Sequence, residues 1–309
     1  MALVPAPGVL TNVWPRALAR WFATRRPDVV HVHSGVWLKA ARAARMAGRI
    51  PVVHTVHGLL DDGSRIERPY QRASFLTDSI VTVSQSLRED LTQRVGIPES
   101  KVHTIVNGID TVRFAPSART NALRRRLHLD DSHRLIGHVG RFAPVKNQAM
   151  LIDAFATIAR VLPSARLVLV GDGPLRSALE ERVAERQIQD LVHFVGEQRD
   201  LAPILCDLDV FVLCSFSEGT SIALLEAMAS GVPCIATDVG GNSAVLDGGA
   251  SGALVASGDV RALDATISRI LGSSEDARAY SSAGRTRAQS RYSEDAMVRQ
   301  YEAIYDSLV

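Results

Sequence analysis

The stretch that decides the fold is VFVLCSFSEGTSIALLEAMASGVPCIAT, residues 210–237. It begins and ends with short apolar runs of strand length that are rich in branched side chains. Between these runs, Thr220 and Ser221 are good N-cap residues and Gly231 is a good stop, so a helix is predicted over 221–230. Strand, helix and strand in this order predict a βαβ unit of a parallel sheet.

The same alternation of short apolar runs with longer amphipathic segments extends along the whole chain. The predicted strands lie at 28–33, 52–57, 79–84, 101–106, 135–140, 166–171, 191–196, 210–215, 233–237 and 252–256. The predicted helices lie at 15–26, 36–48, 66–76, 86–95, 147–160, 174–187, 221–230, 260–271, 275–290 and 294–308. Residues 115–133 are polar and are predicted to be a linker or a peripheral helix. The pattern indicates two doubly wound α/β domains, in which ligands bind beyond the carboxyl ends of the strands.

The composition is that of an ordinary soluble protein, since 46% of the 309 residues are hydrophobic and 22% are charged. No window reaches the roughly 18 uninterrupted apolar residues of a membrane span. The first residues hold two prolines and no basic segment before an apolar run, so they make a poor secretory signal. Cys206, Cys214 and Cys234 have no metal-like spacing, and we expect buried thiols in a reducing compartment.

The net charge of +2 conceals an asymmetry between the two halves of the chain. Residues 1–126 carry 19 Lys and Arg against 9 Asp and Glu, whereas the remainder carries 16 against 24. A basic first half suits anionic lipid, a phosphorylated substrate or nucleic acid, or it is simply a solvated helix face. Nucleic acid is the least favoured of these partners because few aromatic residues are available to stack on bases.

Two cations follow the first strand of the second half, in GRFAPVKN (140–147). Arg141 leaves the strand end and Lys146 precedes the next helix, so both can project beyond the carboxyl edge of the sheet. A guanidinium together with an ammonium binds a diphosphate well. The alternative is a pair of exposed basic residues without a ligand.

Two glutamates flank the start of the predicted helix over 221–230. Glu218 lies on the loop before the helix, whose free N–H groups favour phosphate. Glu226 lies more than a turn inside the helix, and a buried carboxylate needs hydrogen-bond donors. The two vicinal hydroxyls of a ribose would supply them, although a structural glutamate paired with an arginine or a backbone N–H is the alternative.

Three histidines and an acidic pair are the remaining candidate site residues. His57 ends a strand where it can orient a sugar hydroxyl, or it is only a polar strand-end residue. His31 and His33 have metal-like spacing but no third ligand, and we interpret them as structural. CDLD (206–209) is similar to the acidic element that holds a metal-bound nucleotide in other transferases, but it lies at the amino end of its strand, so no metal site is predicted.

Taken together, these motifs resemble the retaining glycosyltransferases of family 4, over nearly the whole chain. The matching strings are PDVVHVHS (27–34), VVHTVHG (52–58), VNGID (106–110), VGRFAPVKN (139–147), LVGDGPLR (169–176), EGTSIALLEAMASGVPCIATDVGG (218–241) and YEAIY (301–305). The resemblance implies the GT-B fold, in which two Rossmann-like domains face each other. Residues 1–128 with the last helix, 294–309, would form the acceptor-side domain, and 129–293 would bind the nucleotide-sugar.

The resemblance also implies roles for individual side chains. Arg141 and Lys146 would bind the donor diphosphate and stabilise the leaving nucleotide. Glu226 would hold the ribose, Glu218 would contact the donor sugar, and His57 would face the transferred sugar. The implied reaction retains the anomeric configuration and uses neither a metal nor a cofactor.

Further contacts are implied for the backbone. Gly219, Thr220 and Ser221 would offer N–H donors to the sugar or the phosphate, and the loop at Val195 and Gly196 would touch the base.

The sequence departs from the family pattern in three places. Family members begin with a strand, a glycine-rich loop and two further strand–helix units before PDVVHVHS, so we expect the first domain to be incomplete, with an unpaired edge at 28–33. Ala244 stands where a carboxylate is often found. The motif EGTS stands where family members usually have EG-F-G or EG-x-P. We expect this difference to have little effect, because Thr220 and Ser221 can cap the helix.

The expected activity is transfer from a UDP-sugar, or second from GDP-mannose, to a glycan or lipid-linked acceptor in cell-envelope or exopolysaccharide biosynthesis. The expected location is the cytoplasm, at the inner face of the plasma membrane, with the basic helices docked on anionic lipid. Two alternatives remain open: a truncated protein that binds nucleotide-sugars without turnover, and a nucleotide-sugar epimerase on the same scaffold.

Overall fold

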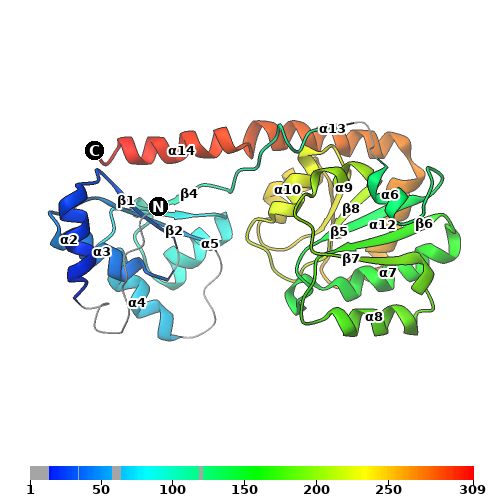
Figure 1. The fold of residues 1–309 in the computed structure, drawn as a ribbon, viewed down its shortest axis with the longest axis horizontal. Coiled ribbons are helices and arrows are strands. Elements are labelled where there is room, and N and C mark those ends of the chain that lie inside the picture. Colours follow the sequence, from blue (N-terminus) through cyan, green and yellow to red (C-terminus); the bar gives the residue numbers. More distant parts are fainter. Residues whose placement is uncertain (1–13, 34, 58–63, 118–120) are drawn as a thin grey trace. The chain divides into compact units, whose positions relative to one another are not determined.

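The computed structural model describes residues 14–33, 35–57, 64–117 and 121–309. The chain divides into two compact units: unit 1 comprises Met1–Asn107 and Met297–Val309, and unit 2 comprises Gly108–Ala296. Each unit contains a parallel sheet with helices packed on it (Figure 1). The predicted α/β class is therefore confirmed.

Unit 1 is built on a four-stranded parallel sheet in the order β1-β2-β3-β4. Its elements are α2 (Arg16–Arg25), β1 (Val30–His33), α3 (Trp37–Met46), β2 (Val52–Val56), α4 (Ser64–Ser74), β3 (Ser79–Thr82), α5 (Gln85–Glu89), a π turn (Asp90–Arg94), a 3-10 turn (Glu99–Lys101), β4 (Val102–Thr104) and the end of α14 (Glu294–Asp306). Among the described residues β1 pairs only with β2, so β1 is an edge strand.

The two faces of this sheet bury different partners because alternate residues of a strand point to opposite faces. Val30 and Val32 of β1 pack with Phe22 of α2 and Trp37 of α3. Residues on the other face, from β2, β3 and the chain after β4, pack against side chains of α14 and of the residues after it; these are Val53, Val81 and Ile105 against Met297, Tyr301, Ile304, Tyr305 and Leu308.

Unit 2 is built on a six-stranded parallel sheet. Its strands are β5 (Arg134–Val139), β6 (Ala165–Val170), β7 (Val192–Gly196), β8 (Val210–Leu213), β9 (Cys234–Thr237) and β10 (Ala253–Val255). Its helices are α6 (Ala122–Arg126), α7 (Gln148–Val161), α8 (Arg176–Glu185), α9 (Ala202–Asp207), α10 (Ile222–Ala229), α11 (Asn242–Val245), α12 (Val260–Gly272) and α13 (Ser274–Arg291). Short 3-10 turns lie at Pro144–Lys146, Gln189–Leu191 and Asp247–Gly249.

The strand order of unit 2 fixes where a ligand can bind. The order is β10-β9-β8-β5-β6-β7, so the chain winds outward from β5 in one direction and from β8 in the other. Helices α7 and α8 lie on one side of the sheet, and α9 and α10 lie on the other (Figure 1). In such doubly wound sheets the crevice beyond the carboxyl ends of the two central strands is the usual ligand site. The loops after β5 and β8 therefore carry the candidate site.

The boundary between the units lies between Asn107 and Gly108, whereas the sequence placed it after residue 128. The described part of the polar stretch 115–133, which excludes 118–120, belongs to unit 2 because α6 packs into it. Leu123 and Arg124 of this short helix are buried, at 3% and 1% exposure.

Candidate functional site

A close ion pair joins the loops that follow β5 and β8. Lys146 ends the 3-10 turn after β5, and Glu218 lies in the loop between β8 and α10. The ammonium Nζ of Lys146 donates to Oε1 of Glu218 at 2.5 Å, with side-chain exposures of 24% and 8%. The structure thus brings together two of the predicted site residues at the predicted edge of the sheet.

Glu218 is held in place by its surroundings. The hydroxyl of Ser215 donates to Oε1 of Glu218 at 2.6 Å, and the N–H of Gly241 donates to the Glu218 carbonyl at 3.1 Å. A Cβ at Gly241 would lie 2.0 Å from the Gly219 carbonyl oxygen, so the backbone packs at a distance that only glycine permits. The VGG motif therefore supports the loop that carries Glu218.

Helix α10 begins where the sequence predicts. The hydroxyl of Ser221 accepts a hydrogen bond from Leu224 N at 3.4 Å and caps the helix. Gly219 has open space around the position of a Cβ. The free N–H groups and the positive dipole end of α10 thus lie beside the loop of Glu218, where they favour an anion.

Glu226 lies on α10, one turn inside the helix, and is half-buried. Within the described part of the chain its carboxylate has no hydrogen bond or ion pair. Burial raises the pKa of Glu226 to about 7, and the nearby charge of Arg113 opposes that rise. Arg113 itself pairs with Asp200 at 2.9 Å. Partial burial thus disfavours the ionised form of the Glu226 carboxylate.

Arg141 opens onto a neighbouring hollow of about 560 Å³ at the ends of β5, β6 and β7. The lining residues are Val139, Gly140, Arg141, Val170, Gly171, Asp172, Gly173, Glu197, Gln198 and Leu201. A Cβ at Gly171 would lie 2.1 Å from the Gly140 carbonyl oxygen, so the loops after β5 and β6 touch backbone to backbone. Arg141 is exposed, with its side chain at the wall of this hollow.

Gln148 and His138, which the sequence did not single out, support the loop that carries Arg141. The amide nitrogen of Gln148 donates to the Arg141 carbonyl at 2.9 Å and contacts Nε2 of His138 at 3.2 Å. His138 is fully buried, and Nδ1 bonds the Val212 carbonyl at 2.9 Å. Burial, with a contribution from the charge of Lys146, lowers the pKa of His138 to about 4, so the ring is neutral.

Val195 and Gly196 belong to the end of β7 rather than to a loop. The Val195 side chain is buried, and its carbonyl already accepts hydrogen bonds from Gln198 at 2.7 Å and from Arg126 at 3.3 Å. The side chains that line the hollow beyond this strand are Glu197 and Gln198.

His57 belongs to unit 1 and directly follows β2. Its Nε2 lies 2.8 Å from Nδ1 of His33. The side chain is exposed, as the position at a strand end predicts.

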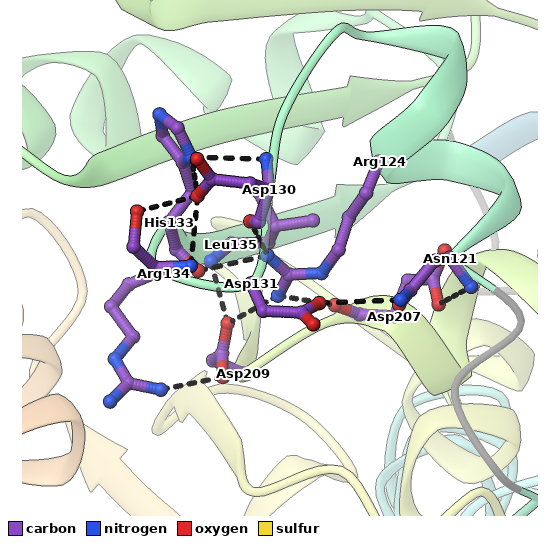
Figure 2. Close-up of polar contacts among 10 residues, drawn as sticks. Asn121, Arg124, Asp130, Asp131, His133, Arg134, Leu135, Asp207 and Asp209 are labelled. Atoms are coloured by element: carbon purple, nitrogen blue, oxygen red, sulfur yellow. Dashed lines mark hydrogen bonds and ion pairs between the residues drawn. The ribbon is translucent and has the colours of Figure 1, made fainter.

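The acidic pair of CDLD is engaged by protein groups at the amino end of β8 (Figure 2). Asp207 accepts hydrogen bonds from the backbone N–H groups of Asn121 and Leu123, at 3.1 and 3.0 Å. Asp209 pairs with the buried guanidinium of Arg124 at 3.1 Å. Within the described ranges no three metal-ligating side chains come together. The pair thus anchors α6 to the amino end of β8.

Fold and site together define a class: a doubly wound α/β protein with two cations, Arg141 and Lys146, in the loop at its switch point. Residues 120–287 match the family model of glycosyl transferases group 1, and residues 3–113 match that of glycosyltransferase family 4. The chain belongs to the group 1 glycosyltransferase family and is an enzyme that transfers a sugar.

Relatives of known activity match most of the chain. The N-acetyl-alpha-D-glucosaminyl L-malate synthase of Bacillus anthracis is 31% identical over 90% of this chain and 74% of its own length. The UDP-Gal:alpha-D-GlcNAc-diphosphoundecaprenol alpha-1,3-galactosyltransferase of Escherichia coli is 30% identical over 75% of this chain and 63% of its own. The structure of Anabaena HepE in complex with UDP is 22% identical in sequence, and the match covers 98% of this chain and 85% of the HepE chain. The TM-score of 0.86 shows that the two proteins share a fold.

No helix within the described ranges is long and apolar enough to cross a bilayer.

Proposed function

We propose that this glycosyltransferase takes a sugar from a nucleotide diphosphate sugar, with a UDP-sugar as the favoured donor and GDP-mannose as the second. The observation that carries the proposal is the Lys146–Glu218 pair at the switch point, 2.5 Å apart, with the partly buried carboxylate of Glu226 on the adjoining helix. A cation, a helix start and a desolvated carboxylate match a diphosphate followed by a ribose.

Each part of the donor has its own partner. Arg141 and Lys146 bind the diphosphate, and the N–H groups of residues 219–221 add donors to phosphate or sugar. Glu226 accepts from the ribose hydroxyls, and Glu218 contacts the transferred sugar. The base lies at the end of β7, near Val195 and Gly196. The favoured base follows from the relatives, since the Anabaena structures hold UDP or UDP-glucose and the Escherichia coli enzyme is named for UDP-Gal.

The proposed chemistry retains the anomeric configuration. The bond between the sugar C1 and the diphosphate oxygen breaks, and the acceptor hydroxyl oxygen bonds to C1 from the same face. The acceptor proton passes to the departing phosphate oxygen. Arg141 and Lys146 stabilise the negative charge that develops there, which is the largest catalytic contribution available to the chain. No metal is needed for this role, and Asp207 and Asp209 already bond to protein groups.

The proposed acceptor is a glycan or a lipid-linked glycan of the cell envelope, presented at the cytoplasmic membrane surface. The name of the Escherichia coli relative contains such a lipid diphosphate. In unit 1, helices α2 and α3 contain no acidic residue and expose several arginines. Trp14, just before α2, and Met46, at the end of α3, are also exposed, at 60% and 43%. Arg16 and Arg20 line a hollow of about 400 Å³ with Met46. Arginines around an apolar anchor suit an anionic bilayer surface.

One assay tests the donor and separates the alternatives. Purified protein is incubated with UDP- and GDP-sugars and an undecaprenyl-diphosphate sugar acceptor, and free nucleotide and product anomer are measured. Nucleotide release with an α-linked product from an α-linked donor supports the proposal. Binding without release would indicate the inactive protein, and interconversion of the donor sugar without release would indicate an epimerase.

Flotation with vesicles tests the membrane part of the proposal. Vesicles containing phosphatidylglycerol should carry the protein, whereas phosphatidylcholine vesicles should not. The double variant Arg16→Glu/Arg20→Glu should lose this binding while it keeps nucleotide affinity. Equal flotation with both vesicle types would contradict docking on anionic lipid.

A further inference from the structure

A buried histidine of β5 is joined by hydrogen bonds to the neighbouring strand on one side and to a glutamine on the other. His138 is fully buried, and its Nδ1 lies 2.9 Å from the Val212 carbonyl oxygen of β8. Its Nε2 lies 3.2 Å from the side-chain amide nitrogen of Gln148, the first residue of α7. The same amide nitrogen donates to the Arg141 carbonyl at 2.9 Å. These contacts link β8 to the loop that carries Arg141, and they lie entirely within unit 2.

The chemistry of the partners fixes where each proton of this chain lies. A backbone carbonyl only accepts, so Nδ1 of His138 must carry a proton to bond Val212. Burial lowers the pKa of His138 to about 4, so the ring holds no second proton at neutral pH and Nε2 is a bare acceptor. One N–H of the Gln148 amide therefore bonds Nε2, and the other bonds the Arg141 carbonyl. A reversed amide would place its oxygen against two acceptors, so this orientation is the one that makes both bonds.

The chain fixes the peptide group that joins Arg141 to Phe142. Its carbonyl oxygen accepts from Gln148 and, at 2.9 Å, from the N–H of Ala143. Its N–H donates to the Asp172 carbonyl at 2.9 Å. Because a peptide group is planar, bonds at both its C=O and its N–H fix its orientation. This restricts the direction in which the Arg141 side chain leaves the backbone, at the wall of the hollow of about 560 Å³.

The stability of the fold gives no reason for a glutamine at position 148. Within the described part of the chain, Oε1 of Gln148 is buried and has no hydrogen-bond partner, and the whole residue is 0% exposed. A buried polar atom without a partner destabilises the folded state, and an apolar side chain of similar size would avoid this cost. What the amide provides is its two N–H bonds, and one of them is to the loop of Arg141.

A glycine lets the histidine ring lie close to this loop. A Cβ at Gly140 would lie 3.2 Å from Nε2 of His138, which is tighter than ordinary contact, and 4.0 Å from Cδ of Lys146. The ring thus lies next to the backbone that leads into Arg141 and near the aliphatic stem of Lys146. The two cations of the candidate site therefore share one buried support.

We propose that His138 and Gln148 are positioning residues of the donor site: Nε2 of His138 orients the Gln148 amide, which holds the Arg141 carbonyl and so directs the Arg141 side chain to the hollow. This inference rests on the proposed function, in which Arg141 binds the donor diphosphate. Both residues are fully buried and act only through Arg141.

Nuclear magnetic resonance of the histidine side chains tests the hydrogen-bond chain without any donor. Protein with ¹⁵N-labelled histidine is measured at pH 7, and His138 is assigned from the spectrum of His138→Gln. We expect the Nδ1–H tautomer, with an Nε2 signal that shifts in Gln148→Met because the amide N–H is lost. An Nε2–H tautomer, or an Nε2 signal that is unchanged in Gln148→Met, would overturn the inference. This readout does not depend on the proposed function.

The affinity for UDP tests the effect on the site. Gln148→Met and His138→Leu should each raise the Kd of UDP about tenfold, because a binding group without its supporting hydrogen bonds loses its geometry. His138→Gln should keep most of the affinity, since its amide oxygen can accept near the place of Nε2. Gln71→Met is the matched control, because it removes an amide that holds the Val95 carbonyl of unit 1 at 2.6 Å. A loss in Gln148→Met no larger than in Gln71→Met would contradict the positioning role.

A second background separates action through Arg141 from general damage to the fold. Arg141→Ala alone should raise the Kd of UDP at least about tenfold. In that background Gln148→Met should change the Kd less than about twofold, because the group that it positions is already absent. The same tenfold loss in both backgrounds would overturn the inference and leave the proposed function intact. Normal UDP binding by Arg141→Ala alone would contradict the proposed role of Arg141, and the inference with it.

Discussion

The ammonium of Lys146 and the carboxylate of Glu218 lie 2.5 Å apart and join the loops that follow β5 and β8. In the free protein each charge neutralises the other within a largely buried site. In the proposed function, a donor diphosphate would compete with Glu218 for Lys146 and would release the carboxylate beside the transferred sugar. The proposal therefore couples donor binding to the release of Glu218.

Lys146→Ala should weaken both nucleotide binding and turnover. A charge-assisted hydrogen bond to phosphate contributes about 1.5–3 kcal/mol, so the Kd of UDP should rise between about tenfold and a hundredfold. Titration calorimetry measures this change. Arg160→Ala removes an exposed cation near the other end of α7 and serves as the control. Equal UDP affinity in Lys146→Ala and Arg160→Ala would remove Lys146 from phosphate binding.

Glu218→Gln should separate binding from turnover. The substitution removes the competitor for Lys146, so UDP should bind as tightly as in the natural protein or more tightly. Sugar transfer should fall at least a hundredfold, because the group that contacts the transferred sugar is lost. Parallel measurements of Kd and kcat test this, and an unchanged kcat would rule Glu218 out of the reaction.

Donor affinity should depend on pH through Glu226. Ribose hydroxyls donate best to the ionised carboxylate, and the free-state pKa of Glu226 is about 7. UDP-glucose, whose diphosphate has no group titrating near 7, should therefore bind more tightly as pH rises from 6 to 8. The same titration on Glu226→Gln should be flat, and a parallel pH dependence in both proteins would contradict the role of Glu226.

Glu226 should also affect the free energy of unfolding, and its raised pKa fixes how this effect changes with pH. Its pKa is raised in the folded protein above the usual value, so the folded state binds the proton more tightly. This contribution to stability is fully present below about pH 4.5 and is lost as pH rises through about 7. Glu226→Gln should accordingly be more resistant to urea than the natural protein at pH 8 and nearly equal to it at pH 4. The opposite order at pH 8 would contradict the raised pKa.

Gly241→Ala should damage activity more than stability. The new Cβ would meet the Gly219 carbonyl oxygen at 2.0 Å, and the backbone that carries Glu218 would have to move. We expect turnover to fall at least tenfold, since a displacement of about 1 Å can cost a hundredfold. Gly272→Ala, which has open space around the Cβ position, is the control. Equal turnover in both variants would show that this packing does not position Glu218.

The anchor at the amino end of β8 gives a prediction about stability alone. Arg124 is 1% exposed and bonds Asp209 as well as backbone carbonyls, whereas Arg134 approaches the same carboxylate from the surface at 48% exposure. Arg124→Ala should cost about 3–5 kcal/mol, because it removes the buried guanidinium from Asp209 and from the backbone carbonyls that it bonds. Arg134→Ala should cost less than about 1 kcal/mol. Urea denaturation measures both, and similar costs would refute the distinction.

Most of the fold could be predicted because its signals are local. Each strand of the described residues lies within two residues of its predicted range, and Ser221 caps α10 as its chemistry indicates. Apolar runs of strand length and capping residues act within a few positions, so one sequence suffices to find them. Helices α9 and α11 were missed because they are short and have no clear periodicity.

The site could be predicted only where residues follow strands directly. Lys146 and Glu218 come together because the sheet order brings the ends of β5 and β8 side by side. The buried support from His138 and Gln148 was missed, since a single histidine within a strand gives no signal of its partner. His33 was interpreted as structural because no third metal ligand was evident, and its contact with His57, which lies 24 residues away, arises only through the pairing of β1 with β2.

A crystal structure of the protein grown with UDP tests the proposed donor site most directly. We expect difference density for the diphosphate within hydrogen-bond distance of Arg141 and Lys146, with ribose hydroxyls on the carboxylate of Glu226. Density for UDP at any other place on unit 2, or a ribose turned away from Glu226, would contradict it.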